Sequence, residues 1–148
     1  MFNSYKIVIW NANGLSNHQN EVKLFICRNQ IDIMLISETH FTKKSTFKIP
    51  NYSLYHTTHP NGTAHGGSAV IINNKIKHHE CDKHSYTHIQ ATVIKIEDSL
   101  GFFAISAVYC PPNITTKEEQ FSNFFLTLGP RFIAGGDYNS KHHHWGSR

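Results

Sequence analysis

The N-terminal part of the chain alternates apolar runs with one amphipathic segment. The runs at 6–10 and 31–36 are almost entirely apolar, which predicts buried strands that are covered on both faces. Between them, residues 18–29 repeat apolar positions at helical spacing, with one face formed by Val22, Phe25 and Ile26. A strand, a helix and a second strand in this order predict an α/β protein.

The middle of the chain is typical of short strands joined by turns. Strands are predicted at 68–73, 76–79, 88–97 and 102–109. The sequence Asp-Ser-Leu-Gly at 98–101 predicts a tight turn, so the last two strands are expected to form an antiparallel hairpin.

The C-terminal part predicts a further helix and a further strand. Thr116 begins a Thr-Lys-Glu-Glu capping box, and the helix after it carries an apolar stripe of Phe121, Phe124, Phe125 and Leu128. A Gly-Pro pair at 129–130 predicts the end of this helix. A strand is then expected at 131–134, followed by a Gly-Gly-Asp-Tyr-Asn loop at 135–139.

Composition narrows the class of protein. The chain has 148 residues, and one domain is expected at this length. Its 39% hydrophobic and 16% charged residues are typical of a globular protein rather than a disordered one. No apolar run reaches the roughly 18 residues that span a bilayer. The start lacks the charged region and cleavage site of a signal peptide. These features predict a protein that is neither membrane-spanning nor secreted.

Charge gives a weaker indication of a partner. The formal net charge is +4 with the histidines counted as neutral. A mildly basic chain suits a polyanion such as nucleic acid, and a merely solvated surface explains the same charge equally well. There is no long Lys/Arg block, so any nucleic-acid surface must be assembled by folding. The cysteines form no CxxC pair, which predicts reduced thiols, with Cys27 and Cys110 in the core.

Polar residues recur where the predicted strands end. Loops at strand ends of α/β proteins converge on one point, so these side chains are candidates for a shared site. They are Asn11, Asn13, Glu38, Tyr109, Asp137 and Asn139.

Two of these positions carry chemistry of their own. Glu38 directly follows a buried run, and a carboxylate there is either a ligand of a hard cation such as Mg²⁺ or a helix or turn cap. Asp137 is able to orient and deprotonate a water, and Asn139 to hold a phosphate oxygen. Spacing alone favours an Asx-type turn at 137–139 over this catalytic interpretation. The adjacent histidines at 142–144 lack the spacing of a zinc site.

The order of the motifs supplies the specific signal. The chain contains Trp-Asn-Ala-Asn-Gly-Leu at 10–15, Ile-Ser-Glu-Thr-His-Phe at 36–41, Val-Tyr-Cys-Pro-Pro at 108–112 and Gly-Asp-Tyr-Asn at 136–139. This ordered set resembles the endonuclease/exonuclease/phosphatase superfamily. The tail through Trp-Gly-Ser-Arg at 145–148, with His-Gly-Gly-Ser-Ala-Val at 65–70, is similar to the apurinic-type endonuclease domain of non-LTR retrotransposons, nearest to the jockey group.

The resemblance implies a fold and a set of roles. The fold would be a DNase I-like, four-layered α-β-β-α sandwich. Glu38, with Asn11 beside it, would hold a divalent metal, Mg²⁺ or Mn²⁺, while Asp137 would activate the attacking water. Asn139 and Tyr109 would hold the scissile phosphate. Contacts to phosphate or duplex DNA would come from Asn11, Asn13, Tyr109, Asn139, His142, Trp145 and Arg148.

The same resemblance implies that the domain continues beyond residue 148. Its closing Ser-Asp-His motif does not occur in this sequence, and Asp-Lys-His at 82–84 stands too early to replace it. We therefore expect 1–148 to be the N-terminal part of one domain that is incomplete at its C-terminal end, with exposed sheet edges and impaired DNA nicking. A downstream reverse transcriptase and action in the nucleus are further expectations. The alternatives are a phosphatase of the same superfamily and a non-catalytic mobile-element remnant that binds nucleic acid weakly.

Overall fold

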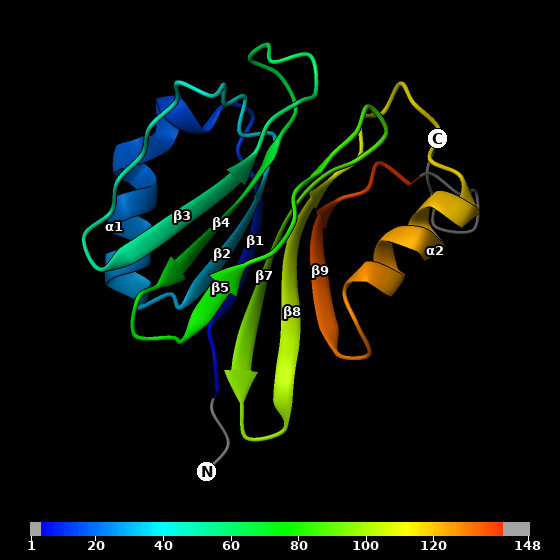
Figure 1. Ribbon diagram of the computed structural model, residues 1–148. Coiled ribbons are helices and arrows are strands. Elements are labelled where there is room, and N and C mark those ends of the chain that lie inside the picture. Colours follow the sequence, from blue (N-terminus) through cyan, green and yellow to red (C-terminus); the bar gives the residue numbers. More distant parts are fainter. Residues whose placement is uncertain (1–3, 141–148) are drawn as a thin grey trace.

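The computed structural model describes residues 4–140 and contains two sheets and two α-helices (Figure 1). The first sheet has the strand order β1 (Ile7–Asn11), β2 (Ile33–Ser37), β4 (Ser68–Asn73), β3 (Tyr52–Thr57). β1 and β2 are parallel, whereas β4 is antiparallel to both of its neighbours. A short 3₁₀ helix (Leu15–His18) and α1 (Gln19–Asn29) connect the two parallel strands.

The second sheet repeats this plan with the later part of the chain. Its order is β5 (His78–Glu80), β7 (Gln90–Asp98), β8 (Gly101–Tyr109), β9 (Phe132–Asp137), and the short β6 (His84–Ser85) also pairs with β7. β7 and β8 form the predicted antiparallel hairpin, in which Asp98 pairs with Gly101 across the turn. β8 and β9 are parallel and are connected by α2 (Glu118–Thr127). Each sheet therefore contains one βαβ unit.

The sheets pack face to face, with α1 outside the first and α2 outside the second (Figure 1). Three apolar clusters fill the spaces between these four layers. Ile26 of α1 belongs to the first cluster, Ile94 and Ile105 belong to the second, between the sheets, and Phe124 of α2 belongs to the third. The predicted α-β-β-α sandwich is therefore confirmed.

The position of β2 between two apolar layers explains why apolar residues occur along it without alternation. Successive side chains of a strand point to opposite faces, and both faces of this strand are covered. Ile33 and Leu35 enter the cluster between the sheets, whereas Met34 and Ile36 pack beneath α1. The strand thus joins two of the three cores and ends directly before Glu38.

Some predictions about the N-terminal elements are wrong. β1 is the edge strand of its sheet, and Ile9 is 54% exposed rather than covered on both faces. Phe25 lies at the border of the buried helix face and is 42% exposed. Cys27 is also exposed, whereas Cys110 is buried as expected. Apolar periodicity located these elements but did not reveal which of them has a neighbouring layer.

Other differences concern boundaries. β3 was not predicted, because an edge strand lacks the continuous apolar run of a buried one. β5 begins two residues later than expected. The side chain of Thr116 donates to the His88 carbonyl instead of capping α2, and Gln120 Oε1 accepts from the Lys117 N–H at 2.8 Å. β9 continues through Gly135, Gly136 and Asp137, which were expected in a loop.

No helix within residues 4–140 is long and apolar enough to cross a membrane.

Candidate active site

Four strands end at one end of the sandwich, and each brings a polar side chain to it (Figure 1). Asn11 is the last residue of β1, and Glu38 follows the last residue of β2. Tyr109 ends β8 and Asp137 ends β9. Because β1 and β2 run parallel, as do β8 and β9, the carboxyl ends within each pair lie at the same sheet edge.

The amide of Asn11 joins the two carboxylates of this group. Its Nδ2 donates to Glu38 Oε1 at 2.9 Å and to Asp137 Oδ2 at 3.1 Å. The Oδ1 atom of the same side chain accepts from the backbone N–H of Asn13 at 3.0 Å. Two like charges close together repel, and a shared N–H donor offsets part of that repulsion. The predicted convergence of Asn11, Glu38 and Asp137 is therefore present.

The carboxylate of Asp137 forms the expected turn and also accepts a hydrogen bond from Asn11. Its Oδ1 accepts from the Asn139 N–H at 3.0 Å, which is the Asx-type turn that spacing favoured. Its other oxygen, Oδ2, receives the bond from Asn11. One oxygen of the Asp137 carboxylate therefore stabilises the turn that follows, and the other oxygen accepts from Asn11.

Glu38 is held in an unfavourable backbone conformation. Its φ is 53°, a left-handed value that is uncommon for residues with a side chain. Asn13, His40 and Asn139 also have positive φ, at 42°, 54° and 46°. Such strain persists only where surrounding bonds impose it, and it gathers at functional sites. Here the Gly14 N–H donates to the Glu38 carbonyl at 2.9 Å, and the His40 N–H donates to the Gly66 carbonyl at 3.0 Å.

The cap interpretation of Glu38 has no support in residues 4–140. No backbone N–H in that part of the chain donates to its carboxylate, which instead accepts from Asn11. Its second oxygen, Oε2, lies 3.6 Å from His40 Nε2. Sequence reasoning missed His40 as a neighbour of the site. Its signal in the sequence was its position two residues after Glu38.

Tyr109 forms an almost fully buried wall of the site, with 8% of its surface exposed. Burial, followed by the negative charges of Glu38 and Asp137, raises the pKa of the phenol to about 12. The group therefore stays protonated at neutral pH and is available as a hydrogen-bond donor. A Cβ on Gly66 would lie 3.2 Å from the Tyr109 ring and 2.7 Å from Gln90 Oε1. Gly66 and Gln90 are thus further packing residues that the sequence did not reveal.

Asn139 connects the end of β9 to the segment after β8. Its Nδ2 donates to the Cys110 carbonyl at 2.7 Å, and the Cys110 N–H donates to the Asp137 carbonyl at 2.8 Å. A side-chain amide has two N–H groups, so one donor and the carbonyl oxygen of Asn139 remain for a ligand. Asn13 is exposed in the loop after β1. His142, Trp145 and Arg148 lie outside the described residues, as do the other histidines of the 142–144 run.

The ligand set is suited to a hard cation. Glu38 and Asp137 offer carboxylate oxygens that both accept from the amide nitrogen of Asn11, and the neighbouring amides are the other oxygen source. Mg²⁺ takes one or two carboxylates and keeps several waters. Within residues 4–140 no group of three or more His, Cys, Asp or Glu side chains is placed to hold a metal ion. The described site therefore fits an oxygen-bound, largely hydrated cation such as Mg²⁺ or Mn²⁺ better than an ion held by several thiolate or imidazole ligands.

Relatives of this chain occur among proteins of mobile elements. The sequence pattern of the Endonuclease/Exonuclease/phosphatase family matches residues 8–148. The RNA-directed DNA polymerase from mobile element jockey of Drosophila melanogaster is 39% identical over 142 residues, which are 96% of this chain. A probable RNA-directed DNA polymerase from transposon BS of the same species is 35% identical over 146 residues. The chain spans 16% of the length of each of these relatives.

Solved structures with the same fold come from nucleases. The endonuclease domain of TRAS1, a telomere-specific non-LTR retrotransposon, superposes with a TM-score of 0.72 at 20% identity, covering 96% of this chain and 64% of that one. An AP endonuclease from Archaeoglobus fulgidus superposes with a TM-score of 0.60 at 14% identity, covering 92% of this chain and 58% of the other. At these identities the likeness concerns the fold alone.

Proposed function

The chain belongs to the endonuclease/exonuclease/phosphatase family, and from this premise we propose that it cuts one strand of duplex DNA as the endonuclease part of a retrotransposon protein. The reaction is hydrolysis of a phosphodiester that leaves a free 3′-hydroxyl. A 3′-hydroxyl is usable as a primer for reverse transcription. The names of the jockey and BS relatives, both RNA-directed DNA polymerases, support a downstream reverse transcriptase as the partner.

One observation carries the proposal. Asn11 Nδ2 links Glu38 from the first sheet to Asp137 from the second, and the Tyr109 phenol lies beside both carboxylates. Phosphodiester hydrolysis needs an activated water and groups that stabilise negative charge developing on the phosphate. The two sheets supply these groups from opposite sides of one small area.

Glu38, with Asn11 beside it, would hold a divalent cation, Mg²⁺ or Mn²⁺. When bound, such a cation supplies Lewis-acid stabilisation of charge on the phosphate oxygens. Asn11 presents its nitrogen to Glu38 and its oxygen to the Asn13 N–H. Presenting the oxygen to a cation requires a half-turn of the amide, a change that exchanges donor and acceptor without moving the backbone.

Asp137 would orient the attacking water and accept its proton. Its Oδ1 is already fixed by the Asn139 N–H, which holds the carboxylate in one orientation. Tyr109 would donate its phenolic hydrogen to a phosphate oxygen, since its raised pKa keeps that hydrogen in place. Asn139 would donate its second amide hydrogen to the same phosphate. Asn13, His142, Trp145 and Arg148 are proposed contacts to the DNA around it.

Two further proposals concern the setting of the reaction. Target DNA lies in the nucleus, so the protein would act there after its synthesis in the cytoplasm. The 148-residue sequence does not contain the Ser-Asp-His motif that the family resemblance places near the end of such domains. Groups that act as a catalytic unit are strongly non-additive. We therefore expect the 148-residue chain by itself to nick DNA very poorly.

A supercoiled-plasmid nicking assay with Mg²⁺ tests the function. Wild type, Glu38→Ala and Asp137→Ala would be compared, each also joined to the segment that follows the matched region in the jockey relative. The proposal expects little nicking by the short chain, clear nicking by the extended wild type, and loss of at least about a hundredfold in both extended variants. Extended variants that nick as fast as the extended wild type would contradict it.

An inositol phosphate offered beside the plasmid addresses the phosphatase alternative. Both substrates carry phosphoesters, but only the plasmid has a phosphodiester backbone on a duplex. Release of phosphate from the small substrate without plasmid nicking would favour the phosphatase. Folded, extended protein that does neither would favour the non-catalytic remnant.

A further inference from the structure

The segment that follows Glu38 contains basic side chains but no acidic ones. Residues 39–79 contain no aspartate or glutamate. Their lysines are Lys43, Lys44, Lys48, Lys75 and Lys77. A stretch of one sign attracts polyanions wherever folding gathers its charges into a concave surface.

The fold places two of these lysines in a groove next to the candidate active site. The groove has a volume of about 750 Å³ and lies between the turn at 42–44 and the β3–β4 loop at 58–62, with Ser85 also lining it. Lys43 and Lys44 stand on one side, and His59 and Asn61 stand on the other. Both walls belong to the acid-free segment.

The walls of the groove are ordered by their own hydrogen bonds. The Thr42 N–H donates to Ser45 Oγ at 2.8 Å, and the Ser45 N–H donates to the Thr42 carbonyl at 3.0 Å. Opposite them, Asn61 Oδ1 accepts from both the N–H and the hydroxyl of Thr63, at 3.0 and 2.8 Å. Ser85 Oγ donates to the Thr58 carbonyl at 2.7 Å. A surface that is already ordered loses less entropy when a ligand binds.

Lys43 and Lys44 differ from their neighbour Lys83. Lys83 lines an adjoining depression, but its Nζ is engaged with Glu80 Oε1 at 2.6 Å and with the His56 carbonyl. Lys43 and Lys44 are exposed, and they form no ion pair with any residue in the range 4–140. Their charges are therefore available to a ligand.

A series of contacts leads from the groove to Glu38. The rings of His59 and His65 lie 4.0 Å apart between centroids, and Gly66, next to His65, accepts from the His40 N–H at 3.0 Å. His40 Nε2 is 3.6 Å from Glu38 Oε2. Lys43 is five residues after Glu38, and five residues span at most about 17 Å. That is about five base-pair steps along a DNA duplex.

We propose that the groove formed by Lys43, Lys44, His59 and Asn61 binds phosphates of the DNA backbone a few nucleotides from the cut. This inference rests on the proposed function and adds the surface that holds the substrate beside the reacting phosphate. The two ammonium groups neutralise one or two phosphates, and the amide of Asn61 faces the same space. Contacts of this kind position the duplex and carry no sequence information.

Binding of a fluorescein-labelled DNA duplex to the 148-residue chain, measured by anisotropy in EDTA over a series of salt concentrations, tests the proposal. Each phosphate contact contributes about −0.9 to the slope of log affinity against log salt. We expect the double variant Lys43→Ala/Lys44→Ala to have a slope shallower by about 1 to 2, with an unchanged melting temperature.

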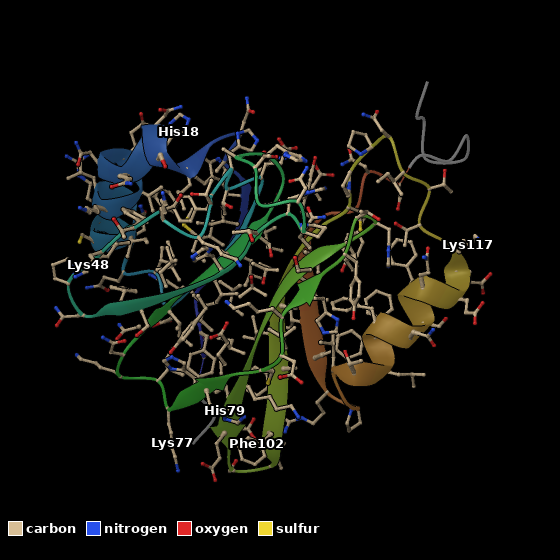
Figure 2. The ribbon with its side chains drawn as sticks, turned by 45° about the horizontal axis from the view of Figure 1, so that its top comes forward. His18, Lys48, Lys77, His79, Phe102 and Lys117 are labelled. Carbon is tan, nitrogen blue, oxygen red and sulfur yellow. The ribbon has the colours of Figure 1, made fainter. Side chains whose placement is uncertain are left out.

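The matched control is Lys48→Ala/Lys75→Ala, which removes the same charge from the same acid-free segment. Lys75 follows Asn73 at the end of β4 remote from Ser68, and Asn73 pairs with Tyr52, the residue that begins β3 shortly after Lys48. Lys48 lies on the flank of the molecule beside α1 (Figure 2). The control is expected to keep the slope of the wild type.

The outcomes distinguish phosphate binding in the groove from the proposed nicking reaction. Equal slopes for the groove variant and the control would overturn the phosphate site, as would undetectable binding of DNA by folded wild type. Equal slopes do not bear on the proposed nicking, which is judged by the Glu38 and Asp137 variants of the extended chain.

Discussion

Asn11 and Asp137 are separated by 126 positions in the sequence, yet the Asn11 Nδ2 atom donates to Asp137 Oδ2 at 3.1 Å. The bond connects the end of β1 in the first sheet with the end of β9 in the second. It places one amide between two carboxylates, because the same nitrogen also donates to Glu38. One side-chain amide thus links the ends of the two sheets through both carboxylates.

Replacing Asn11 with aspartate should make the protein depend on a divalent cation for stability. The variant places a third carboxylate against Glu38 and Asp137 and removes the shared N–H donor. We expect a stability loss of about 1 kcal/mol in EDTA, equivalent to roughly 3 °C in melting temperature, and recovery on addition of Mg²⁺. Thermal unfolding followed by circular dichroism measures both effects.

Asn13→Asp is the control for this prediction. It makes the same charge change two residues away, and the structure shows the Asn13 backbone, rather than its side chain, bonded to Asn11. Its melting temperature is expected to respond to Mg²⁺ as that of the wild type does. An equal response of the two variants would show that the Asn11 position has no special relation to a cation.

Asp137→Asn should preserve the turn at 137–139 and remove the proposed role of Asp137 as a general base. An asparagine oxygen still accepts from the Asn139 N–H, so the Asx-type turn and the fold are expected to survive. The side chain no longer accepts a proton from water, and loss of a general base costs about a hundredfold to ten-thousandfold in rate. Nicking by the extended chain, measured beside its melting temperature, checks this. A variant that nicks normally would remove Asp137 from the catalytic group.

Alkaline pH should destabilise the protein through Tyr109. The pKa of this phenol is raised from 10.0 to about 12 by burial and then by the charges of Glu38 and Asp137. In the unfolded chain the group loses its proton first, so the folded state binds more protons and stability falls as pH rises. The contribution is complete below pH 10 and is lost as pH rises from 10 to 12.

Urea unfolding across this pH range, with Tyr109→Phe as the comparison, measures the effect. The variant has no phenol at this position, so its stability should fall less steeply with pH than that of the wild type. Tyr138, whose pKa burial also raises to about 12, accounts for part of the fall that remains. Parallel pH profiles of the two proteins would contradict the assignment to Tyr109.

Gly136→Ala should disrupt the strand that presents Asp137. A Cβ at this position would lie 1.9 Å from the Val108 carbonyl oxygen, in the strand that pairs with β9. The three nearest atoms all belong to the backbone of Val108, which cannot move aside as a flexible side chain can, so we expect a loss of at least about 3 kcal/mol in the free energy of unfolding. Gly101→Ala is the control, because its φ is 107° but no atom lies within 4 Å of the added Cβ. Its cost is expected to be about 1–2 kcal/mol. Equal losses would contradict the close approach at Gly136.

Local sequence determined which segments form the core elements. The unbroken apolar run at 31–36 and the stripe of Phe121, Phe124 and Leu128 specify a buried strand and an amphipathic helix, because burial on two faces or one requires these patterns. The structure contains both, as β2 and α2. Edge elements were less predictable. β3 was missed and the exposure of Ile9 was unexpected, because a strand's sequence does not show whether another strand or layer covers it.

The sequence also determined which residues were candidates for the site, since their motifs occur in a specific order. It did not determine whether both oxygens of Asp137 belong to a turn, and the structure shows one oxygen in the Asx-type turn and the other accepting from Asn11. Nor did it indicate that His40 lies beside Glu38, a contact between two residues that both have positive φ in the structure. The joining of Asn11 to two carboxylates and the groove beside Lys43 were decided only by tertiary structure. Each requires segments that are separated in sequence to lie side by side in the folded protein. Local sequence patterns do not specify which separated segments do so.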